Sequence, residues 1–386
     1  MGKIEHYSNM DKKLVRVKRN SSVELLRILC MFFIVFHHFM INSAFPNYKT
    51  DALNGFNGSL GVALVLNGFF CVSVNCFILI TGYYGLKFKL RGFVRLYLVC
   101  AFYGLIGYFV HLYVDNASLG RSILQYSLFA LTNSKWWFIN CYVVLLFSAP
   151  LLNVAINTMS KELYLNILLL LAIVNVYFGF LGGTYCYNQY GYNVQQFVFM
   201  YVIGGYLRRF VDVHKLKFHR SKCLLVFVCC SIAVGLMAVI ENFVAHSELK
   251  AYYNCNPLII VAAVSFFAYV LSFNFYNKTI NKLALGVVAV YLFQDQQFIG
   301  AGWLYPMVLK WLSQWNQSCN LSSDFVLVTC EFGLLTVLSL FFVLALLLFD
   351  QFRMLVMKPV WIIYDKIEHG FYNSKLCVKL FLSKEQ

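Results

Sequence analysis

The chain has 386 residues, of which 61% are apolar and 12% are charged, and its formal net charge is +15. A soluble domain has about 45–50% apolar and about 25% charged residues, so this much apolar surface cannot be hidden inside one water-soluble globule. The composition excludes disordered, collagenous and nucleic-acid-binding proteins, and it predicts an all-α, polytopic membrane protein.

Ten windows of the sequence are mainly apolar over about 20 residues, which is long enough to cross a hydrocarbon core. We predict a ten-helix bundle over 23–349, preceded by a basic segment, 1–22, and followed by a basic and aromatic segment, 350–386, on the membrane surface. The sixth and ninth windows carry Asn, Gln or Asp clusters and are expected to face the bundle interior. The predicted spans are 23–41, 59–82, 93–113, 136–156, 163–182, 193–211, 223–244, 257–275, 283–303 and 325–349.

The basic residues predict the orientation of the bundle. Of the 31 Lys and Arg residues, 24 fall in segments on one side of the predicted spans and five on the other. Because cytoplasmic loops are enriched in Lys and Arg, we expect both termini in the cytoplasm and an even number of spans. Trp136 and Trp137, which open the fourth span, are expected at the outer membrane interface.

The first span carries the most informative polar residues. Ionisable groups are costly inside a membrane, and Arg27 and His38 lie eleven residues apart. Eleven steps of about 100° bring both side chains to one helix face, with a rise of about 16 Å. The spacing predicts a conduit with a cation at its cytoplasmic mouth and a titratable base deeper in the membrane. Alternatively, Arg27 reaches the headgroups and His38 makes an interhelical hydrogen bond.

Carboxylates are expected near the same depth or further out. Asp295 lies in the ninth span at a depth similar to that of His38, while Glu241 and Glu331 lie in the outer halves of their spans. Together they predict an acidic vestibule open to the outside and suited to hydrogen-bonding sugar hydroxyls. The alternative is that each carboxylate satisfies a neighbouring helix or reaches interfacial water.

Further polar groups lie on the second and third spans. Arg91 and Arg95 belong to a basic segment that topology explains in part, and they could hold a phosphorylated cytoplasmic ligand. Asn75 is more often interhelical glue than a ligand contact. The sequence has no Walker-type loop, HExxH, GxSxG or zinc-type Cys and His spacing, so we expect no metal.

Four segments, in order, resemble the acyltransferase 3 family of integral membrane acyltransferases. The first contains the family's Arg, ten residues and His pattern as Arg27 and His38. The resemblance runs through most of 20–350 and implies ten spans with cytoplasmic ends. The four segments are 20–38, 74–83, 136–139 and 201–208.

The resemblance implies transfer of an acyl group, usually acetyl, from cytoplasmic acetyl-CoA to a hydroxyl of a surface polysaccharide or its lipid-linked precursor. The expected location is the bacterial cytoplasmic (inner) membrane. The expected partners are membrane lipids, acyl-CoA and the glycan acceptor, with no permanently bound cofactor and no nucleic acid. Arg27, Arg91 and Arg95 would bind the phosphates of acetyl-CoA, and Asn75 and Glu331 would help to bind substrate.

For catalysis, the resemblance implies that His38 acts as a general base or carries the acyl group transiently as a nucleophile. Asp295 would orient the imidazole or the sugar, and His37 stays open as an alternative to His38. The chain departs from the family at Gln294, where many relatives have His. The cytoplasmic basic pair, Arg91 and Arg95, is also spaced more widely than in the family.

Two other functions fit a polytopic chain with buried polar residues. A transporter or flippase of a glycan or lipid-linked sugar is the main alternative, and it should show inverted repeats or broken helices in matching halves. A glycan polymerase typically needs a large outer loop, and the outer connections predicted here are short. Neither expectation is met by the sequence.

Overall fold

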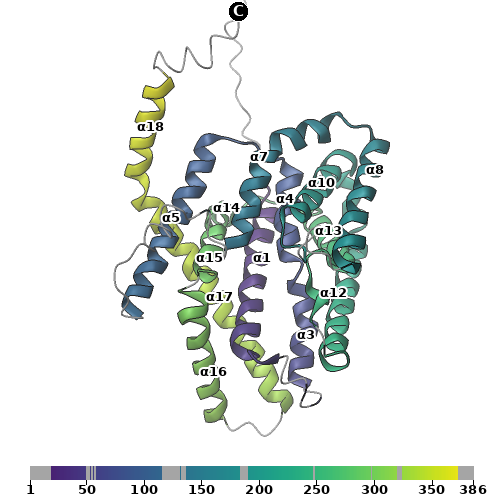
Figure 1. Cartoon of the computed structure of the whole chain (residues 1–386), viewed down its shortest axis with the longest axis vertical. Coiled ribbons are helices and arrows are strands. Elements are labelled where there is room, and N and C mark those ends of the chain that lie inside the picture. The colour runs from purple at the N-terminus through teal and green to yellow at the C-terminus, as the bar shows by residue number, and fades with distance from the viewer. Residues whose placement is uncertain are drawn as a thin grey trace, which may run out of the picture.

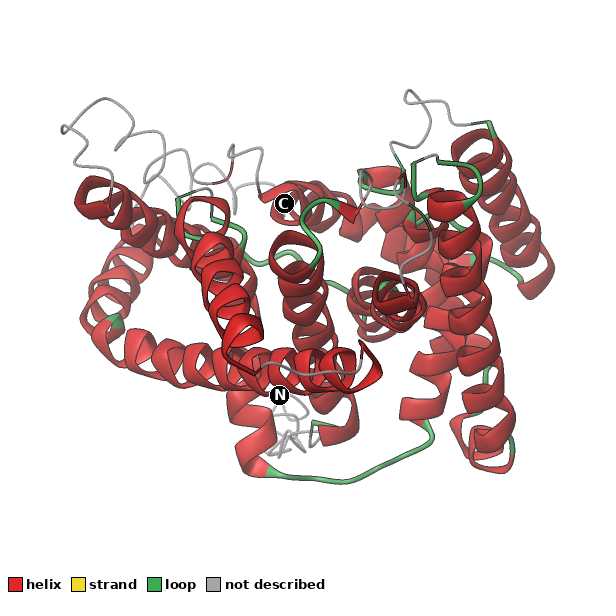
Figure 2. Ribbon diagram, turned by 90° about the horizontal axis from the view of Figure 1, so that it is seen from below, coloured by secondary structure: helices red, strands yellow, loops and turns green. Residues whose placement is uncertain are grey.

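The computed structural model of the chain describes residues 19–48, 53, 55, 58–114, 131, 136–182, 190–246, 248–296, 298–319 and 324–372. Within these ranges the chain forms helices and connecting loops, with no strand (Figures 1 and 2). The elements are α1 (Ser21–Phe39), η1 (Met40–Ala44), α3 (Gly58–Phe70), α4 (Ser73–Tyr84), α5 (Leu90–Val114), α7 (Trp137–Thr158), α8 (Lys161–Ala172), η5 (Ile173–Leu181), α10 (Val194–Phe210), α11 (Val213–Phe218), α12 (Arg220–Phe243), η6 (Lys250–Tyr252), α13 (Pro257–Leu271), α14 (Lys278–Leu283), η7 (Ala284–Gly286), α15 (Val287–Gln294), η8 (Gly300–Leu304), α16 (Tyr305–Cys319), α17 (Asp324–Val356) and α18 (Lys358–Tyr372).

The predicted all-α, polytopic architecture is confirmed. Among the described residues, eight helical segments are long and apolar enough to cross a membrane, and each overlaps one predicted span. The other two predicted spans correspond to α10, which has 17 residues, and to a broken segment around α15. The eight segments are Ser21–Ala44, Gly58–Tyr84, Leu90–Tyr113, Trp137–Thr158, Lys161–Leu181, Arg220–Phe243, Lys250–Leu271 and Thr329–Val356.

The predicted ninth span, 283–303, is not a continuous helix. The helix α15 ends at Gln294, and the side-chain oxygen of Gln296 accepts the backbone N–H groups of Phe298 and Ile299 at 2.6 and 3.0 Å. A side-chain acceptor thus competes with the helical carbonyls for these donors. Irregular backbone at membrane depth is tolerated where it is buried in protein or lines a cavity. The polar cluster therefore breaks the span.

The helix α1 lies in the centre of the bundle, where it contacts α4, α13, α15 and α17 (Figure 1). Its first turn is capped by Asn20, whose side chain accepts the backbone N–H of Ser22 at 3.0 Å. The hydroxyl of Ser21 donates to the side chain of Asn281 at 2.8 Å, which fixes the start of α1 against α14. The start of α1 is therefore fixed within the protein by polar contacts.

Glycines allow α4 and α10 to pack closely. A Cβ atom at Gly204 would lie 2.5 Å from the carbonyl oxygen of Leu79 and 2.8 Å from the backbone nitrogen of Tyr83. Small residues at such contacts let membrane helices approach one another and gain dispersion energy. This approach brings the polar side chains of α10 against those of α4.

The C-terminal part of the chain continues the tenth predicted span as a longer helix. The helix α17 runs to Val356, beyond the predicted boundary at 349, and α18 follows as a separate helix at the upper left of Figure 1. Most of the predicted basic segment 1–22, namely 1–18, and the end of the predicted tail, 373–386, lie outside the described residues.

Candidate functional site

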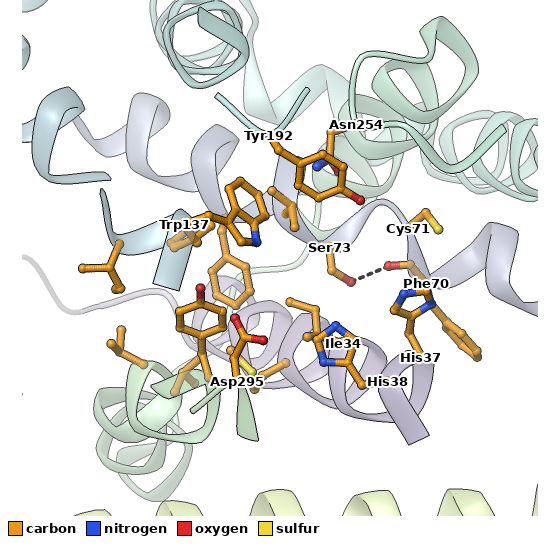
Figure 3. Close-up of a pocket in the computed structure, with 18 of the residues that line it drawn as sticks. Ile34, His37, His38, Phe70, Cys71, Ser73, Trp137, Tyr192, Asn254 and Asp295 are labelled. Atoms are coloured by element: carbon orange, nitrogen blue, oxygen red, sulfur yellow. Dashed lines mark hydrogen bonds between the residues drawn. The ribbon is translucent and has the colours of Figure 1, made fainter. Parts of the chain in front are cut away.

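A cavity of about 180 Å³ lies beside the middle of α1, and we call it the histidine cavity. Helices α1, α4, α7 and α15 supply most of its walls, and the segments around Tyr192 and Asn254 complete it (Figure 3). The break after α15 brings Asp295 to the same cavity as His38, as their similar depths in the sequence suggest. Its principal polar and aromatic residues are His37, His38, Asp295, Asn254, Trp137 and Tyr192.

A second cavity of about 360 Å³ lies nearer the ends of α4, α5 and α17, and we call it the basic cavity. Arg27 and Arg95 line it, together with Lys87 and Lys89. The structure therefore places Arg27 and His38 on the same side of α1 but on two different cavities. The two cavities share one apolar wall, formed by Phe77, Phe138, Ile139, Val287 and Val288.

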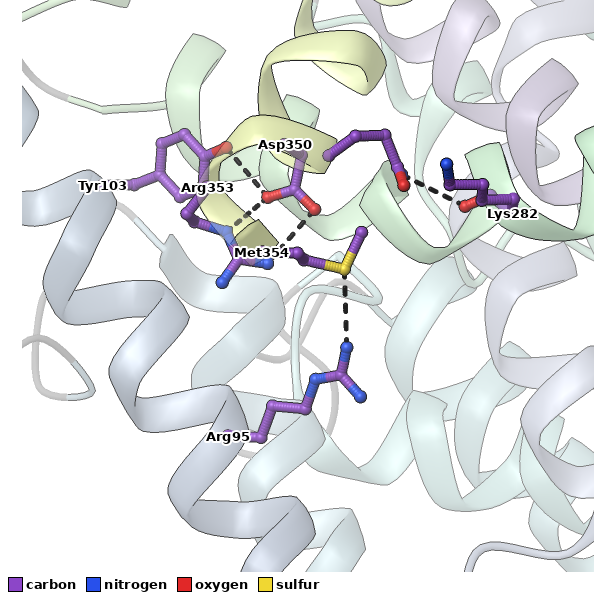
Figure 4. A network of polar contacts seen from close by, with 7 residues as sticks. Arg95, Tyr103, Lys282, Asp350, Arg353 and Met354 are labelled. Carbon is purple, nitrogen blue, oxygen red and sulfur yellow. Dashed lines mark hydrogen bonds and ion pairs between the residues drawn. The ribbon is translucent and has the colours of Figure 1, made fainter. Parts of the chain in front are cut away.

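The arginines of the basic cavity have different partners. Arg27 is one third exposed and lies 3.7 Å from Glu24, the ion pair that helical spacing allows. Arg95 is exposed and donates to the sulfur of Met354 at 3.6 Å (Figure 4). Both guanidinium groups keep most of their donors for a ligand, and neither forms an ion pair with a carboxylate other than Glu24 in the described part of the chain.

A buried ion pair at the edge of the basic cavity was not predicted. Asp350 accepts two hydrogen bonds from Arg353, at 2.5 and 3.1 Å, and one from the hydroxyl of Tyr103 at 3.0 Å (Figure 4). Both charged side chains are at most 5% exposed. Asp350 and Arg353 fall in the segment predicted as a cytoplasmic tail, 350–386, because the apolar window of the tenth span ends before them.

His38 is held by two residues from the broken helix and the helix that follows it. The side-chain nitrogen of Gln294 donates to its Nδ1 atom at 3.0 Å, and the hydroxyl of Tyr305 lies 3.3 Å from the same atom. That hydroxyl also lies 3.3 Å from the backbone oxygen of Gln294. Gln294, the residue at which the sequence departs from the family pattern that it resembles, thus contacts His38 directly.

His37 is held from the opposite side, by α3. Its Nδ1 atom lies 2.5 Å from the side-chain oxygen of Asn67, which is fully buried. The rings of His37 and His38 are 5.3 Å apart between centroids, and both line the histidine cavity. The structure therefore keeps both histidines as candidates.

Asn75 does not line the histidine cavity but supports a residue that does. Its side chain donates to the backbone oxygen of Asn254 at 2.9 Å, and Gln196 donates to the same oxygen at 2.9 Å and to Asn75 at 3.2 Å. Gly191, at φ +80°, allows its own backbone to pack closely on Asn254, because a Cβ atom there would lie 2.6 Å from that residue. The interior position predicted for the sixth span is thus found at Gln196, which is fully buried.

Three other predicted site residues lie away from the two cavities. Glu331 accepts a hydrogen bond from Asn316 at 2.5 Å, and Glu241 accepts the backbone N–H of Ala251 at 2.9 Å. The predicted acidic vestibule is therefore not assembled, since Asp295 alone of its three carboxylates lines the histidine cavity.

Arg91 is the third. It pairs with two carboxylates of α18, at 2.8 Å from Asp365 and 3.9 Å from Glu368, and its guanidinium lies 5.7 Å from the ring of Trp361. Arg91 is not among the residues that line the basic cavity.

The tryptophans at the start of α7, predicted to lie at the outer membrane interface, are packed within the protein. Trp136 is fully buried, and Trp137 lines the histidine cavity with its ring 4.8 Å from that of Tyr192. Aromatic rings beside an amide form a surface that suits the face and hydroxyls of a sugar ring. The sequence shows only that two tryptophans open this span, so the place of Trp137 in the cavity wall could not be predicted from it.

A protein-family model described as an acyltransferase domain, that of the acyltransferase 3 family, matches residues 20–348. No curated protein and no solved structure matches the chain.

Proposed function

The chain belongs to the acyltransferase 3 family, and on this premise we propose that it transfers acetyl from cytoplasmic acetyl-CoA to a hydroxyl of a cell-surface polysaccharide or its lipid-linked precursor. That it is a multi-pass membrane acyltransferase follows from the family and from the long apolar helices. The acetyl group, the CoA donor, the glycan acceptor and a location in the bacterial cytoplasmic membrane belong to the proposal.

The observation that carries the proposal is the pair of cavities on either side of one apolar wall. Phosphates of CoA would bind in the basic cavity, where Arg27 and Arg95 offer charged, fork-shaped donors. The thioester end would reach across the wall toward His37, His38 and Asp295. This arrangement brings a cytoplasmic donor and an outer acceptor to one reaction centre.

The residues of the histidine cavity suit acyl transfer to a hydroxyl. A histidine at the cavity can exchange a proton with the acceptor or stabilise the developing oxyanion. Asp295 is within the same cavity and can orient the acceptor or a histidine ring. Trp137, Tyr192 and Asn254 would bind the acceptor sugar.

Acetyl transfer from labelled acetyl-CoA in membranes tests the proposal. Removal of a proton-transfer group or of a donor to the developing oxyanion typically lowers rates by about 100-fold or more, so His38→Ala should lose at least about 100-fold in transfer. His219→Ala, at a histidine bonded to the Lys215 carbonyl oxygen in a cytoplasmic turn, serves as the matched control. Full activity of His38→Ala at normal abundance would reject the assignment.

Glycan analysis with and without the gene separates the enzyme from a flippase. Loss of O-acetyl groups with polymer length unchanged supports acyl transfer. Loss of the polymer itself would instead identify a protein that moves or extends the glycan.

A further inference from the structure

We propose that the two adjacent histidines have opposite tautomers and divide the chemistry, with His37 as the proton-accepting base and His38 as a hydrogen-bond donor to the reacting carbonyl. The inference rests on the proposed acyl transfer. It is carried by the two buried amides that hold the rings, one on α3 and one on α15 (Asn67 and Gln294).

His37 meets an amide oxygen. Its Nδ1 atom lies 2.5 Å from Oδ1 of Asn67, and a carbonyl oxygen can only accept a hydrogen bond. The Nδ1 atom therefore carries the proton of the neutral ring. The lone pair is then on Nε2, which makes His37 competent to accept a proton from a hydroxyl in the cavity that it lines.

His38 meets an amide nitrogen. The Nε2 atom of Gln294 lies 3.0 Å from Nδ1 of His38, and an amide nitrogen can only donate. The hydroxyl of Tyr305 lies 3.3 Å from the same atom, but it donates its single proton to the backbone oxygen of Gln294, so the amide nitrogen of Gln294 alone decides the tautomer. The Nδ1 atom of His38 is therefore the acceptor, and its proton is on Nε2.

Both amides are fully buried, since Asn67 and Gln294 are 0% exposed. In Asn67 the atom that does not face its histidine, Nδ2, meets the side-chain oxygen of Tyr252, which fits the orientation with Oδ1 toward His37. In Gln294 the corresponding atom, Oε1, is buried without a hydrogen-bond partner in the described ranges. An unpaired buried amide oxygen is costly, so Gln294 contacts His38 at an energetic cost.

With these tautomers, every proton and bond in the acyl transfer can be accounted for. The acceptor hydroxyl passes its proton to Nε2 of His37 while its oxygen bonds to the thioester carbonyl carbon. The Nε2–H group of His38 donates to the carbonyl oxygen as negative charge develops there, a task that neutral imidazole can perform. The carbon–sulfur bond then breaks, and the CoA sulfur takes the proton from His37, which leaves an ester, a free thiol and two neutral histidines.

The surroundings do not supply a competing base of the same kind on α1 or α3. The rings of His37 and His38 lie side by side at the cavity, as Figure 3 shows. The other titratable groups that face them from neighbouring elements are Asp295, Tyr291, Tyr305, Cys71, Tyr192 and Tyr252.

Nitrogen NMR of the full-length protein, labelled at histidine and held in detergent, reads the tautomers without any activity measurement. We expect a protonated Nδ1 for His37 and a protonated Nε2 for His38, with the signals assigned by difference from His37→Gln and His38→Gln. If the side-chain amide of Asn67 or Gln294 were rotated by a half-turn, its oxygen and nitrogen would exchange places, and the tautomer of the histidine that it contacts would be reversed. The same tautomer in both rings would overturn the proposal.

Removal of each amide tests its positioning role. Asn67→Leu should return only His37 to a mixture of tautomers, and Gln294→Met should do so only for His38. The control is Asn175→Leu, because Asn175 is also buried but donates to the Leu171 carbonyl oxygen, away from the cavity. Unchanged tautomers in both amide variants would overturn the assignment.

Kinetics separate this inference from the proposed function. His37→Ala should lose at least about 100-fold in acetyl transfer, and the part of the pH–rate profile that reports titration of the base should disappear. His38→Ala should lose rate but keep the wild-type pH–rate profile. A pH limb lost in His38→Ala instead would overturn the division of roles but leave the acyltransferase proposal intact. Full activity in both variants would overturn both.

Discussion

Arg27 combines three properties of a phosphate-binding residue. It lines the basic cavity, it is 34% exposed, and its one ion-pair partner in the described part of the chain is Glu24 at 3.7 Å. A guanidinium so placed can bind a phosphate through two parallel hydrogen bonds while Glu24 limits its rotation. Its contribution should therefore appear in donor binding and not in the chemical step.

Arg27→Gln should raise the KM for acetyl-CoA about tenfold, because a hydrogen bond to a charged group contributes about 1.5–3 kcal/mol and each 1.4 kcal/mol is tenfold in affinity. The kcat should change little. The measurement is initial-rate kinetics in membranes, with Lys161→Gln, at the start of α8, as the charge-matched control. An equal rise in KM in the control would assign the effect to surface charge.

Single residues of the site were predictable where helix periodicity alone decides. Arg27 and His38 share a face of one helix, and that geometry is set within the sequence of α1. Asn67 and Tyr305 could not be found in this way, because they meet the histidines through the packing of separate helices. Gln294 was noted as a departure from the family, but its contact with His38 needed the structure.

At the scale of elements, α18 is attached to the bundle by a small set of contacts with α5. Arg91 pairs with Asp365 and Glu368 and approaches the ring of Trp361. Exposed ion pairs contribute about 0–1 kcal/mol each, so the attachment depends on the three contacts acting together. The sequence interpretation of Arg91 as a CoA ligand stays a prediction, and these contacts provide an alternative role.

Arg91→Gln should release α18 and speed tryptic cleavage after Lys366 severalfold, while acetyl-CoA binding stays within about twofold of the wild type. The experiment is limited proteolysis of inside-out vesicles that contain a C-terminally tagged protein. Lys282→Gln, at the end of α14, serves as the control. A large rise in the KM for acetyl-CoA without faster cleavage would favour the sequence interpretation.

Most spans were predictable because their apolar windows are long, and packing adds little to that signal. The break at Asp295 was not, since hydropathy averages four polar residues with the apolar ones on either side. The helix breaks because the Gln296 side-chain oxygen accepts hydrogen bonds from backbone N–H groups that a continuous helix would need.

At the scale of the whole molecule, the basic cavity and α18 lie toward the end of the bundle that carries most Lys and Arg. The bias of 24 residues against five predicts that this end faces the cytoplasm. A cytoplasmic basic cavity would be open to CoA, so the orientation and the proposed donor depend on each other.

Reporter fusions test the orientation. Green fluorescent protein joined after residue 386 should fluoresce, and alkaline phosphatase joined at the same place should be inactive, because each reporter works on one side of the membrane only. A phosphatase fusion in the loop between α12 and α13, at His246, should be active. Active phosphatase at the C-terminus would invert the bundle and reject a cytoplasmic donor site.

The apolar wall between the two cavities has a bioenergetic consequence. Phe77, Phe138, Ile139, Val287 and Val288 present hydrocarbon to both sides, and a bare ion that crossed hydrocarbon would meet a barrier of several kcal/mol. An uncharged acyl thioester on a slender arm does not meet that barrier. On the proposed function, a protein in a membrane that stores energy as an ion gradient would therefore pass a chemical group outward without letting protons leak inward.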